Sequence, residues 1–225
     1  IARSGDYLQQ QLQQLARQYP RLRLAIVAHS MGGLVARHAL ETWDDPRRLV
    51  THLFTLGTPH AGSSLLAGHP WIKAYYHFAQ DDTVAEAIAN GLDEATEDLS
   101  PGSLFLRQLN SRPRATGVRY YVAVGRRPLL ADADRSQLQQ GFLEFLQRQG
   151  APRATREEVQ RFFDGTELKD GLGDGVVSVK SASLPGADGV RVFDADHLDL
   201  IYLPGGSPQQ HEVFRWVLDT LRWAP

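Results

Sequence analysis

The chain has 225 residues, enough for one sizeable domain that buries about 70–75% of the surface of its unfolded chain. Its net charge of −2 comes from interspersed acidic and basic residues, which indicates no nucleic-acid partner and no strongly acidic partner. There is no cysteine, which excludes disulfides, thiolate chemistry and cysteine metal sites. The chain contains no signal peptide and no apolar run long enough to cross a bilayer, so we expect it to be soluble, and its compartment stays open.

The chain begins with a predicted amphipathic helix that is followed by a buried strand. Ser4 is expected to cap the helix, and its apolar residues repeat at helical spacing until Pro20 ends it. Residues 21–28 then form a strand, and residues 24–28 are apolar enough for a buried parallel strand. A second helix is predicted over residues 31–43.

The turn between this strand and the second helix contains one serine, Ser30. Ala28 and Gly32 lie two positions to either side of it, where the strand and the helix must pass close together. A strand, a sharp turn and a helix are the context in which a serine becomes an exposed nucleophile. The alternative is a serine in an ordinary turn that caps the next helix, but this reading does not explain the small residues on both sides.

A second strand is predicted over residues 50–56, and a proline-containing loop over residues 57–63 follows it. In an open α/β sheet the carboxyl ends of the strands border the ligand crevice. We therefore expect the loop to line the site, with Thr58, Pro59 and His60 as substrate-binding residues. His60 is also a candidate base. A stiff turn so close to a strand, however, suits a residue that lines the site better than a catalytic base.

Two insertions separate the remaining strands, at about residues 64–116 and 126–170. Within them, helices are predicted at residues 83–90, 103–110, 135–149 and 155–163. The aromatic residues Trp71, Tyr75 and Phe78 of the first insertion share one helical face. Its place in the chain favours a lid or cover over the site, and packing of these residues in the core is the alternative. The second insertion contains no evident chemistry.

A third strand is predicted over residues 118–124 and a last one over residues 190–193. We expect an α/β fold with a mostly parallel sheet and helices on both faces. We predict one domain over residues 1–225. Its core comprises residues 1–63, 117–125 and 171–225.

The sequence Ala-His-Ser-Met-Gly-Gly at residues 28–33 resembles the nucleophile signature of the lipase and esterase branch of the α/β-hydrolases. The run Thr-Leu-Gly-Thr-Pro-His-Ala-Gly-Ser at residues 55–63 is similar to the loop after the nucleophile helix in bacterial lipases and lecithin–cholesterol acyltransferase-like proteins. One departure is Ala28, which replaces the usual first glycine. The resemblance implies an α/β-hydrolase fold and a serine nucleophile at Ser30.

The candidate acid of the site is Asp174, within the glycine-dense segment 171–177. Neighbouring glycines permit positive φ angles, which can turn a carboxylate inward. Lipases of the resembled branch place their catalytic acid in a similar Asp-Gly-Val element. A solvent-facing turn is the alternative for Asp174, and Asp164 and Asp170 are its rivals as the acid.

The candidate base is His197, which lies just after the last predicted strand and before the terminal helix. The order serine, aspartate, histidine matches the α/β-hydrolases and differs from the two other common serine-protease folds. His211 is the main rival. It falls in the terminal helix that begins near Ser207, and we expect it at the surface or as a cap.

The resemblance implies a serine hydrolase that cleaves acyl or lipid esters through an acyl-enzyme. Ser30 would attack the carbonyl carbon, His197 would take and return the proton, and Asp174 would orient the imidazole. The backbone N–H of Met31 would be one oxyanion donor. The second donor of the family comes from a His-Gly loop after an earlier strand, and residues 1–225 contain no such loop.

In the resembled fold the nucleophile follows the fifth strand, whereas Ser30 lies near the start of this chain. We therefore expect that N-terminal strands are missing from the chain, by truncation rather than by loss of the strands. As written, the chain would lack one oxyanion donor and would be crippled or inactive.

No cofactor and no metal are expected. Asp199 resembles a calcium ligand of some bacterial lipases, but no second carboxylate is identified, so a local hydrogen-bond acceptor is the preferred role. The expected partner is a small-molecule or lipid ester, with a transient contact to a lipid interface. Two alternatives stay open, namely acyl transfer or deacylation of a lipid conjugate by the same residues, and an inactive binding protein of this fold.

Overall fold

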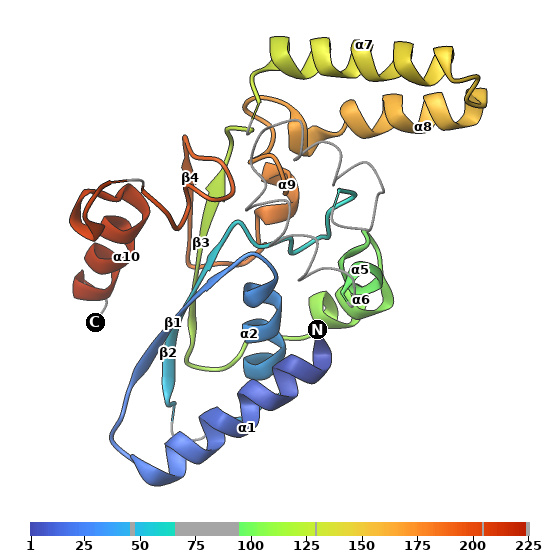
Figure 1. Ribbon diagram of the computed structural model, residues 1–225. Coiled ribbons are helices and arrows are strands. Elements are labelled where there is room, and N and C mark those ends of the chain that lie inside the picture. Colours follow the sequence, from blue (N-terminus) through green and yellow to red (C-terminus); the bar gives the residue numbers. More distant parts are fainter. Residues whose placement is uncertain (46–47, 66–94, 129, 204, 224–225) are drawn as a thin grey trace.

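The computed structural model describes residues 1–45, 48–65, 95–128, 130–203 and 205–223 (Figure 1). Its sheet has four strands in the order β1-β2-β3-β4, and every neighbouring pair is parallel. The strands are β1 (Leu24–His29), β2 (Val50–Leu56), β3 (Arg119–Gly125) and β4 (Gly189–Phe193). This arrangement confirms the predicted α/β class.

Helices separate and flank the strands (Figure 1). The longer ones are α1 (Ala2–Gln18), α2 (Met31–Glu41), α6 (Leu104–Ser111), α7 (Asp132–Arg148), α8 (Arg153–Phe163) and α10 (Glu212–Trp223). The short ones are α5 (Thr96–Leu99), η1 (Thr166–Leu168), α9 (Val179–Ala182) and η2 (Pro208–Gln210).

The carboxyl ends of the strands align at one edge of the sheet. His29 pairs with Leu56, Leu56 pairs with Ala123, and Gly125 pairs with Phe193. The loops that leave the four strands therefore begin side by side. This edge is where an open α/β sheet places its ligand site.

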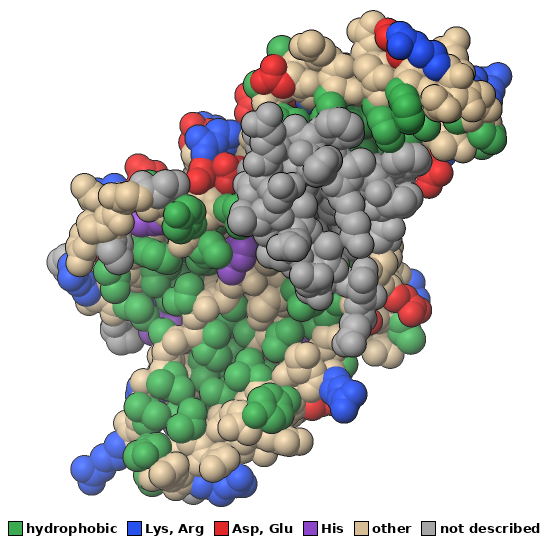
Figure 2. All heavy atoms as spheres, viewed as in Figure 1, with side chains coloured by type: hydrophobic (Ala, Val, Ile, Leu, Met, Phe, Trp, Pro, Cys, Tyr) green, Lys and Arg blue, Asp and Glu red, His purple; other side chains and the backbone are tan. Residues whose placement is uncertain are grey.

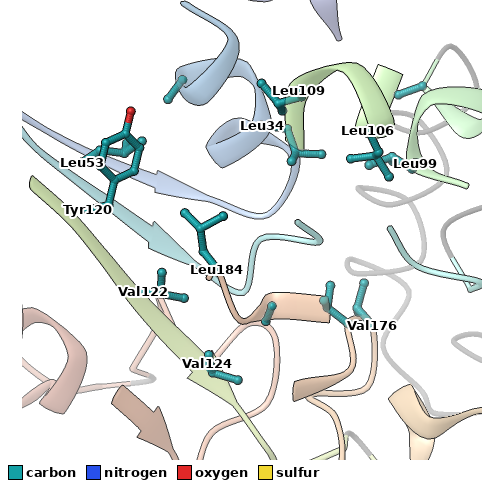
Figure 3. Packing of buried hydrophobic residues seen from close by; sticks show 14 of the residues in the cluster. Leu34, Leu53, Leu99, Leu106, Leu109, Tyr120, Val122, Val124, Val176 and Leu184 are labelled. Carbon is teal, nitrogen blue, oxygen red and sulfur yellow. The ribbon is translucent and has the colours of Figure 1, made fainter. Parts of the chain in front are cut away.

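The two faces of the sheet bury separate apolar clusters, because side chains alternate along each strand. On one face the buried cluster joins strand residues to α1, α2, α6 and α9. Figure 3 shows part of it, including Leu34, Leu53, Leu109, Tyr120, Val122 and Leu184. On the other face Phe54, Leu56 and Ala123 pack against Val213 and Val217 of α10. Helices thus cover both faces, as predicted.

Element boundaries differ from the prediction by a few residues, for local reasons. The first helix begins at Ala2, and Ser4 does not cap it, because Ser4 already lies inside the first turn. The first strand begins at Leu24 rather than residue 21, since the amide of Leu22 closes a turn onto the carbonyl of Tyr19. Ser103 caps α6 by accepting from the amide of Leu106, so that helix begins one residue later than predicted.

The two predicted insertions differ in how much the structure describes. Residues 66–94, which include the aromatic face of Trp71, Tyr75 and Phe78 and the helix predicted over residues 83–90, lie outside the described residues. The second insertion contains α7 and α8, which pack side by side as a helical hairpin that projects from the body of the molecule (Figure 1). A lid function for either insertion stays a prediction, and so does the division into core and insertions.

The first strand forms an edge of the described sheet, and part of its apolar surface is exposed. Ala25 is exposed and Val27 is 46% exposed. Figure 2 shows apolar side chains gathered on the part of the surface over β1 and α1. Whether further strands precede Ile1 stays a prediction. Across the described residues, none of the helices is both long and apolar enough to span a membrane.

Candidate active site

Ser30 lies at a sharp turn between β1 and α2, with φ 53° and ψ −133°. It is one of two non-glycine residues with positive φ in the described part of the chain, and such a conformation is strained for an L-residue. Its amide donates to the carbonyl of Leu56 over 2.9 Å, which ties the turn to the end of β2. Its side chain makes no capping hydrogen bond to α2, so the reading of Ser30 as an ordinary helix cap is wrong.

The small residues around the serine act differently from the sequence expectation. A Cβ built on Gly32 would meet only the Cβ of Ala28, at an ordinary contact distance of 3.9 Å. A Cβ built on Gly33 would overlap the side chain of Thr58, with Thr58 Cγ2 only 2.7 Å away. Close packing therefore requires a glycine one residue later, where α2 contacts the loop after β2.

Asp174 is fully buried, so the alternative of a solvent-facing turn is wrong. Its Oδ1 accepts hydrogen bonds from the amides of Val176 (3.0 Å) and Val177 (2.7 Å). Gly175, with φ 91°, makes the turn that brings these amides back to the carboxylate. A buried carboxylate needs such partners, because desolvation without them is costly. The rival acids Asp164 and Asp170 are exposed.

His197 is buried beside Asp174, and two hydrogen bonds join the residues. Its Nδ1 donates to Oδ2 of Asp174 over 2.8 Å, and its amide donates to the carbonyl of Asp174 over 2.9 Å. Because a carboxylate can only accept, the imidazole proton is on Nδ1, and Nε2 is left with a lone pair. The structure thus brings together the predicted acid and the predicted base, with the base oriented to accept a proton at Nε2.

Glycines at the ends of β2 and β3 make room for this pair. A Cβ built on Gly57 would be 3.0 Å from Oδ2 of Asp174 and 3.1 Å from Nδ1 of His197. A Cβ built on Gly125 would be 2.7 Å from the Cβ of Asp174. The pair therefore lies directly on the carboxyl edge of the sheet. A glycine inside or at the end of a strand is a recognisable signal of close approach, but the sequence does not show what approaches.

Ser30 lies at the same edge as the pair. Its amide is bonded to Leu56, the residue before Gly57, and its neighbour His29 contacts His197. Within the described part of the chain, the hydroxyl of Ser30 makes no hydrogen bond with His197. Such bonds are often long in unliganded enzymes. The catalytic roles of Ser30, Asp174 and His197 stay predictions.

Met31 is the first residue of α2, so its amide belongs to the first-turn N–H groups that have no partner within the helix. Such amides, at the positive end of a helix, suit a developing negative charge. The geometry fits the predicted oxyanion donor, and that role also stays a prediction.

His60 is buried and both of its ring nitrogens are engaged. Nδ1 lies 3.3 Å from Nη1 of Arg37, and Nε2 lies 3.1 Å from Oγ1 of Thr55. Since arginine can only donate, Nδ1 accepts and the proton is on Nε2, which donates to Thr55. Burial, and secondarily the charge of Arg37, hold the pKa of His60 well below its usual value. The alternative of His60 as the base therefore has no support.

Thr58 and Pro59 are buried with His60, and within the described residues the Thr58 hydroxyl has no hydrogen-bond partner. Substrate binding by these three residues stays a prediction.

A buried ion pair in α2, next to the loop after β2, was not evident from the sequence. Arg37, fully buried, donates to Oε1 and Oε2 of Glu41 over 3.0 and 3.2 Å and to Oδ1 of Asn110 over 2.9 Å. Asn110 in turn donates to the carbonyl of His60 over 2.8 Å. The network joins α2, α6 and the loop after β2. His60 and Asn110 are far from α2 in the sequence. From the sequence alone, Arg37 and Glu41 look like an ordinary i,i+4 ion pair on the surface of a helix.

The loop that contains His197 is held from the outside by an ion-pair cluster. Oδ1 of Asp196 accepts from the amides of Leu198 (3.0 Å) and Asp199 (2.9 Å). Arg127 pairs with the carboxylates of both Asp196 and Asp199. Asp199 is thus a local acceptor, as expected. Within the described residues, no group of three or more histidine, aspartate or glutamate side chains could hold a metal ion.

His211 differs from the expectation of a surface position. It is 5% exposed, directly precedes α10 and stacks on Phe214, with ring centroids 4.5 Å apart. Among the described residues, its ring nitrogens have no hydrogen-bond partner. The expected cap role is met only by its backbone, whose carbonyl accepts from the amide of Arg215 over 2.9 Å.

Comparison with known proteins gives a family match and several matches of fold. A family model described as "PGAP1-like alpha/beta domain" matches residues 1–97. No curated protein matches the sequence. Among solved structures, mature lipase BlEst2 of Bacillus licheniformis is 23% identical, with a TM-score of 0.52 over 86% of this chain and 66% of that one. The product of lin2722 from Listeria innocua is 14% identical, with a TM-score of 0.53 over 99% of this chain and 66% of that one.

The chain spans a little under two thirds of the length of these two structures. At such identities the matches concern the fold, which agrees with the parallel sheet, the serine turn and the flanking helices described above. The fold of the chain is therefore similar to that of a bacterial lipase, and residues 1–97 are similar to the PGAP1-like alpha/beta domain.

Proposed function

We propose that this protein hydrolyses carboxylic esters of the acyl or lipid type, with Ser30 as nucleophile, His197 as base and Asp174 as the orienting acid. The observation that supports this most strongly is a combination of two features at one edge of the sheet. Ser30 has a strained, positive-φ backbone at the start of α2. The buried pair of Asp174 and His197 lies against Gly57, one residue after the partner of the Ser30 amide. Strain of this kind gathers at functional sites.

The reaction follows from the chemistry of these groups. Nε2 of His197 takes the proton from the Ser30 hydroxyl while Oγ bonds to the ester carbonyl carbon, and the carbonyl π electrons move to oxygen. The amide of Met31 donates to this oxyanion. When the intermediate collapses, the bond to the alcohol oxygen breaks, and His197 returns the proton to that oxygen. The product is an alcohol and an acyl ester of Ser30.

Water completes the cycle by the same steps. His197 takes a proton from a water molecule, whose oxygen bonds to the acyl carbon. Collapse then breaks the bond to Oγ of Ser30, and the proton passes from His197 to Ser30. The carboxylic acid leaves. Asp174, whose carboxylate accepts three hydrogen bonds, orients His197 and stabilises the imidazolium at each transfer.

The test is covalent labelling of the full-length protein with a fluorophosphonate, which reacts with activated serines. We expect labelling of the wild-type protein and none of Ser30→Ala. Ser30→Ala should also lower kcat by up to about 10⁶-fold. Ser4→Ala, in α1, is the matched control and should label like the wild type. An absence of labelling in well-folded wild-type protein would contradict the proposal and favour a binding protein of this fold.

Substrate class is tested separately, with nitrophenyl esters of increasing acyl length. One fold neighbour is named as a lipase, which supports an ester of the lipid type for this protein. We expect kcat/KM to rise from the acetate to medium and long chains. A maximum at the acetate would instead assign a short-chain esterase.

A further inference from the structure

His29, the last residue of β1, contacts the predicted base directly. Its Nε2 lies 2.9 Å from the carbonyl oxygen of His197. The two imidazole rings also pack together, with centroids 4.5 Å apart and planes inclined by 47°. In the sequence the residues are 168 positions apart, and His29 directly precedes Ser30. The contact therefore joins the strand that ends at the nucleophile to the loop that contains the base.

The contact fixes the chemical state of His29. A carbonyl oxygen can only accept, so Nε2 of His29 has the proton and donates it. Burial, and secondarily the charge of His197, lower the pKa of His29 to about 4. The ring is therefore neutral at neutral pH. It donates the hydrogen bond without adding a positive charge beside His197 when that residue becomes an imidazolium.

Among the residues that the structure describes, the other hydrogen bonds of His197 all involve the acid. Its Nδ1 and its amide donate to the side chain and the carbonyl of Asp174. Within the described residues, the bond from His29 is the one hydrogen bond that connects His197 to β1. The bonds to Asp174 orient the imidazole relative to the acid, and the bond from His29 fixes its main chain relative to Ser30.

We infer that His29 is a positioning residue, whose donated N–H holds the main chain of His197 at the distance from Ser30 that proton transfer requires. This inference rests on the proposed function. Misplacement of a catalytic group by about 1 Å can lower a rate by about 10²-fold. The bond from His29 ties His197 to the strand that leads to Ser30, so it acts on the distance between these two residues. We therefore expect it to affect kcat rather than substrate binding.

The experiment separates the hydrogen bond from the ring contact. His29→Phe keeps an aromatic ring against His197 and removes the donor. His29→Gln removes the ring but places an amide N–H near the position of Nε2. His29→Asn has a polar side chain that is too short to reach the carbonyl, and it keeps the test valid if the Phe variant does not fold. His52→Phe is the control, since His52 lies near the start of β2 and stacks on Phe54 and Tyr121.

Each variant of the full-length protein is measured for its rate of fluorophosphonate labelling and for kcat and KM on one nitrophenyl ester. We expect His29→Phe and His29→Asn to lower the labelling rate and kcat by about 10- to 100-fold, with KM within about threefold of wild type. His29→Gln should retain at least about one third of the wild-type rates, and His52→Phe should match the wild type.

Two results would overturn the inference. The first is His29→Phe labelling as fast as the wild type. The second is an equal loss in His29→Gln and His29→Phe, which would assign the effect to ring packing. Failure of the proposed function is a different observation, namely wild-type protein that neither labels nor hydrolyses the ester.

Discussion

The amide of Ser30 donates a 2.9 Å hydrogen bond to the carbonyl of Leu56, so the strained serine turn is fixed to the end of β2. The next residue, Gly57, lies against the pair of Asp174 and His197. One strand end therefore sets the position of Ser30, the proposed nucleophile, on one side and of the proposed acid and base on the other. The geometry of the candidate site depends on the absence of a side chain at Gly57.

Gly57→Ala is therefore expected to reduce activity strongly. The added Cβ would be 2.8 Å from Leu200 Cδ1 and about 3 Å from the hydrogen-bonded atoms of the pair, so His197 must shift. A shift of about 1 Å should lower kcat by about 10²-fold. The backbone, with φ +55°, adds a cost of about 1–2 kcal/mol to stability. The measurement is kcat on a nitrophenyl ester, together with a urea unfolding curve.

Gly102→Ala is the control for this prediction. Gly102 has φ +73°, but a Cβ built there meets nothing within 4 Å. Its substitution should therefore show the cost of positive φ in the unfolding curve and leave kcat unchanged. Equal kcat values for the two variants would contradict the role given to Gly57.

Adjacent glycines of the serine turn give a second prediction. Gly33→Ala should lower stability by about 1–3 kcal/mol, because its Cβ would overlap the side chain of Thr58. Gly32→Ala should change stability by less than about 1 kcal/mol, because its Cβ would make one ordinary contact in a helix that favours alanine. Urea unfolding of both variants measures the difference, and a larger loss in Gly32→Ala would show that the strand and helix cross more closely at Gly32.

Asp174→Asn tests the acid. The substitution keeps the size of the side chain but can hold the wrong tautomer of His197, with the proton on Nε2, so that no lone pair faces the nucleophile. In serine hydrolases such a change lowers kcat by about 10⁴-fold. Asp170→Asn, at the exposed rival position, is the control and should retain wild-type kcat. A reversed outcome, with loss only in Asp170→Asn, would move the acid to that loop.

The sequence predicted what depends on local pattern. The order of strands and helices followed from apolar periodicity and turn residues, and the serine turn followed from a six-residue signature next to a strand. The proximity of Asp174 and His197 was expected only through the family resemblance, because loops that leave neighbouring strand ends meet in space and not along the chain. The hydrogen bond between them is now visible in the structure.

Contacts between distant polar residues were beyond prediction. The buried position of Arg37 and Glu41 is set by α6 and the loop after β2, so their spacing in α2 resembles that of an ordinary surface pair. The sequence offers His60 as a base or as a residue that lines the site, and its bonds to Arg37 and Thr55 show that it belongs to this network. The crowding at Gly33 rather than Gly32 likewise depends on where Thr58 lies.

The buried His60 gives a prediction for the pH dependence of stability. Its pKa in the folded protein lies well below the value of about 6.5 expected in the unfolded chain, mainly because of burial. Above pH 6.5 both states are neutral, and the contribution of His60 to stability is fully present. As the pH falls below 6.5, the unfolded chain binds a proton that the folded protein does not, so the free energy of unfolding decreases by up to about 1.4 kcal/mol per pH unit.

His60→Gln should remove this contribution while its amide retains one donor and one acceptor for Thr55 and Arg37. The measurement is the free energy of unfolding in urea at pH 7.5, 6.5, 5.5 and 5.0, for the wild type and the variant. We expect the two curves to run parallel above pH 6.5 and the wild type to lose stability more steeply below it, by up to about 1.4 kcal/mol per unit. His29, whose pKa burial lowers to about 4, is present in both proteins, so its contribution cancels. Curves that stay parallel down to pH 5.0 would show that His60 takes up a proton in the folded protein, which its bond from Arg37 should prevent.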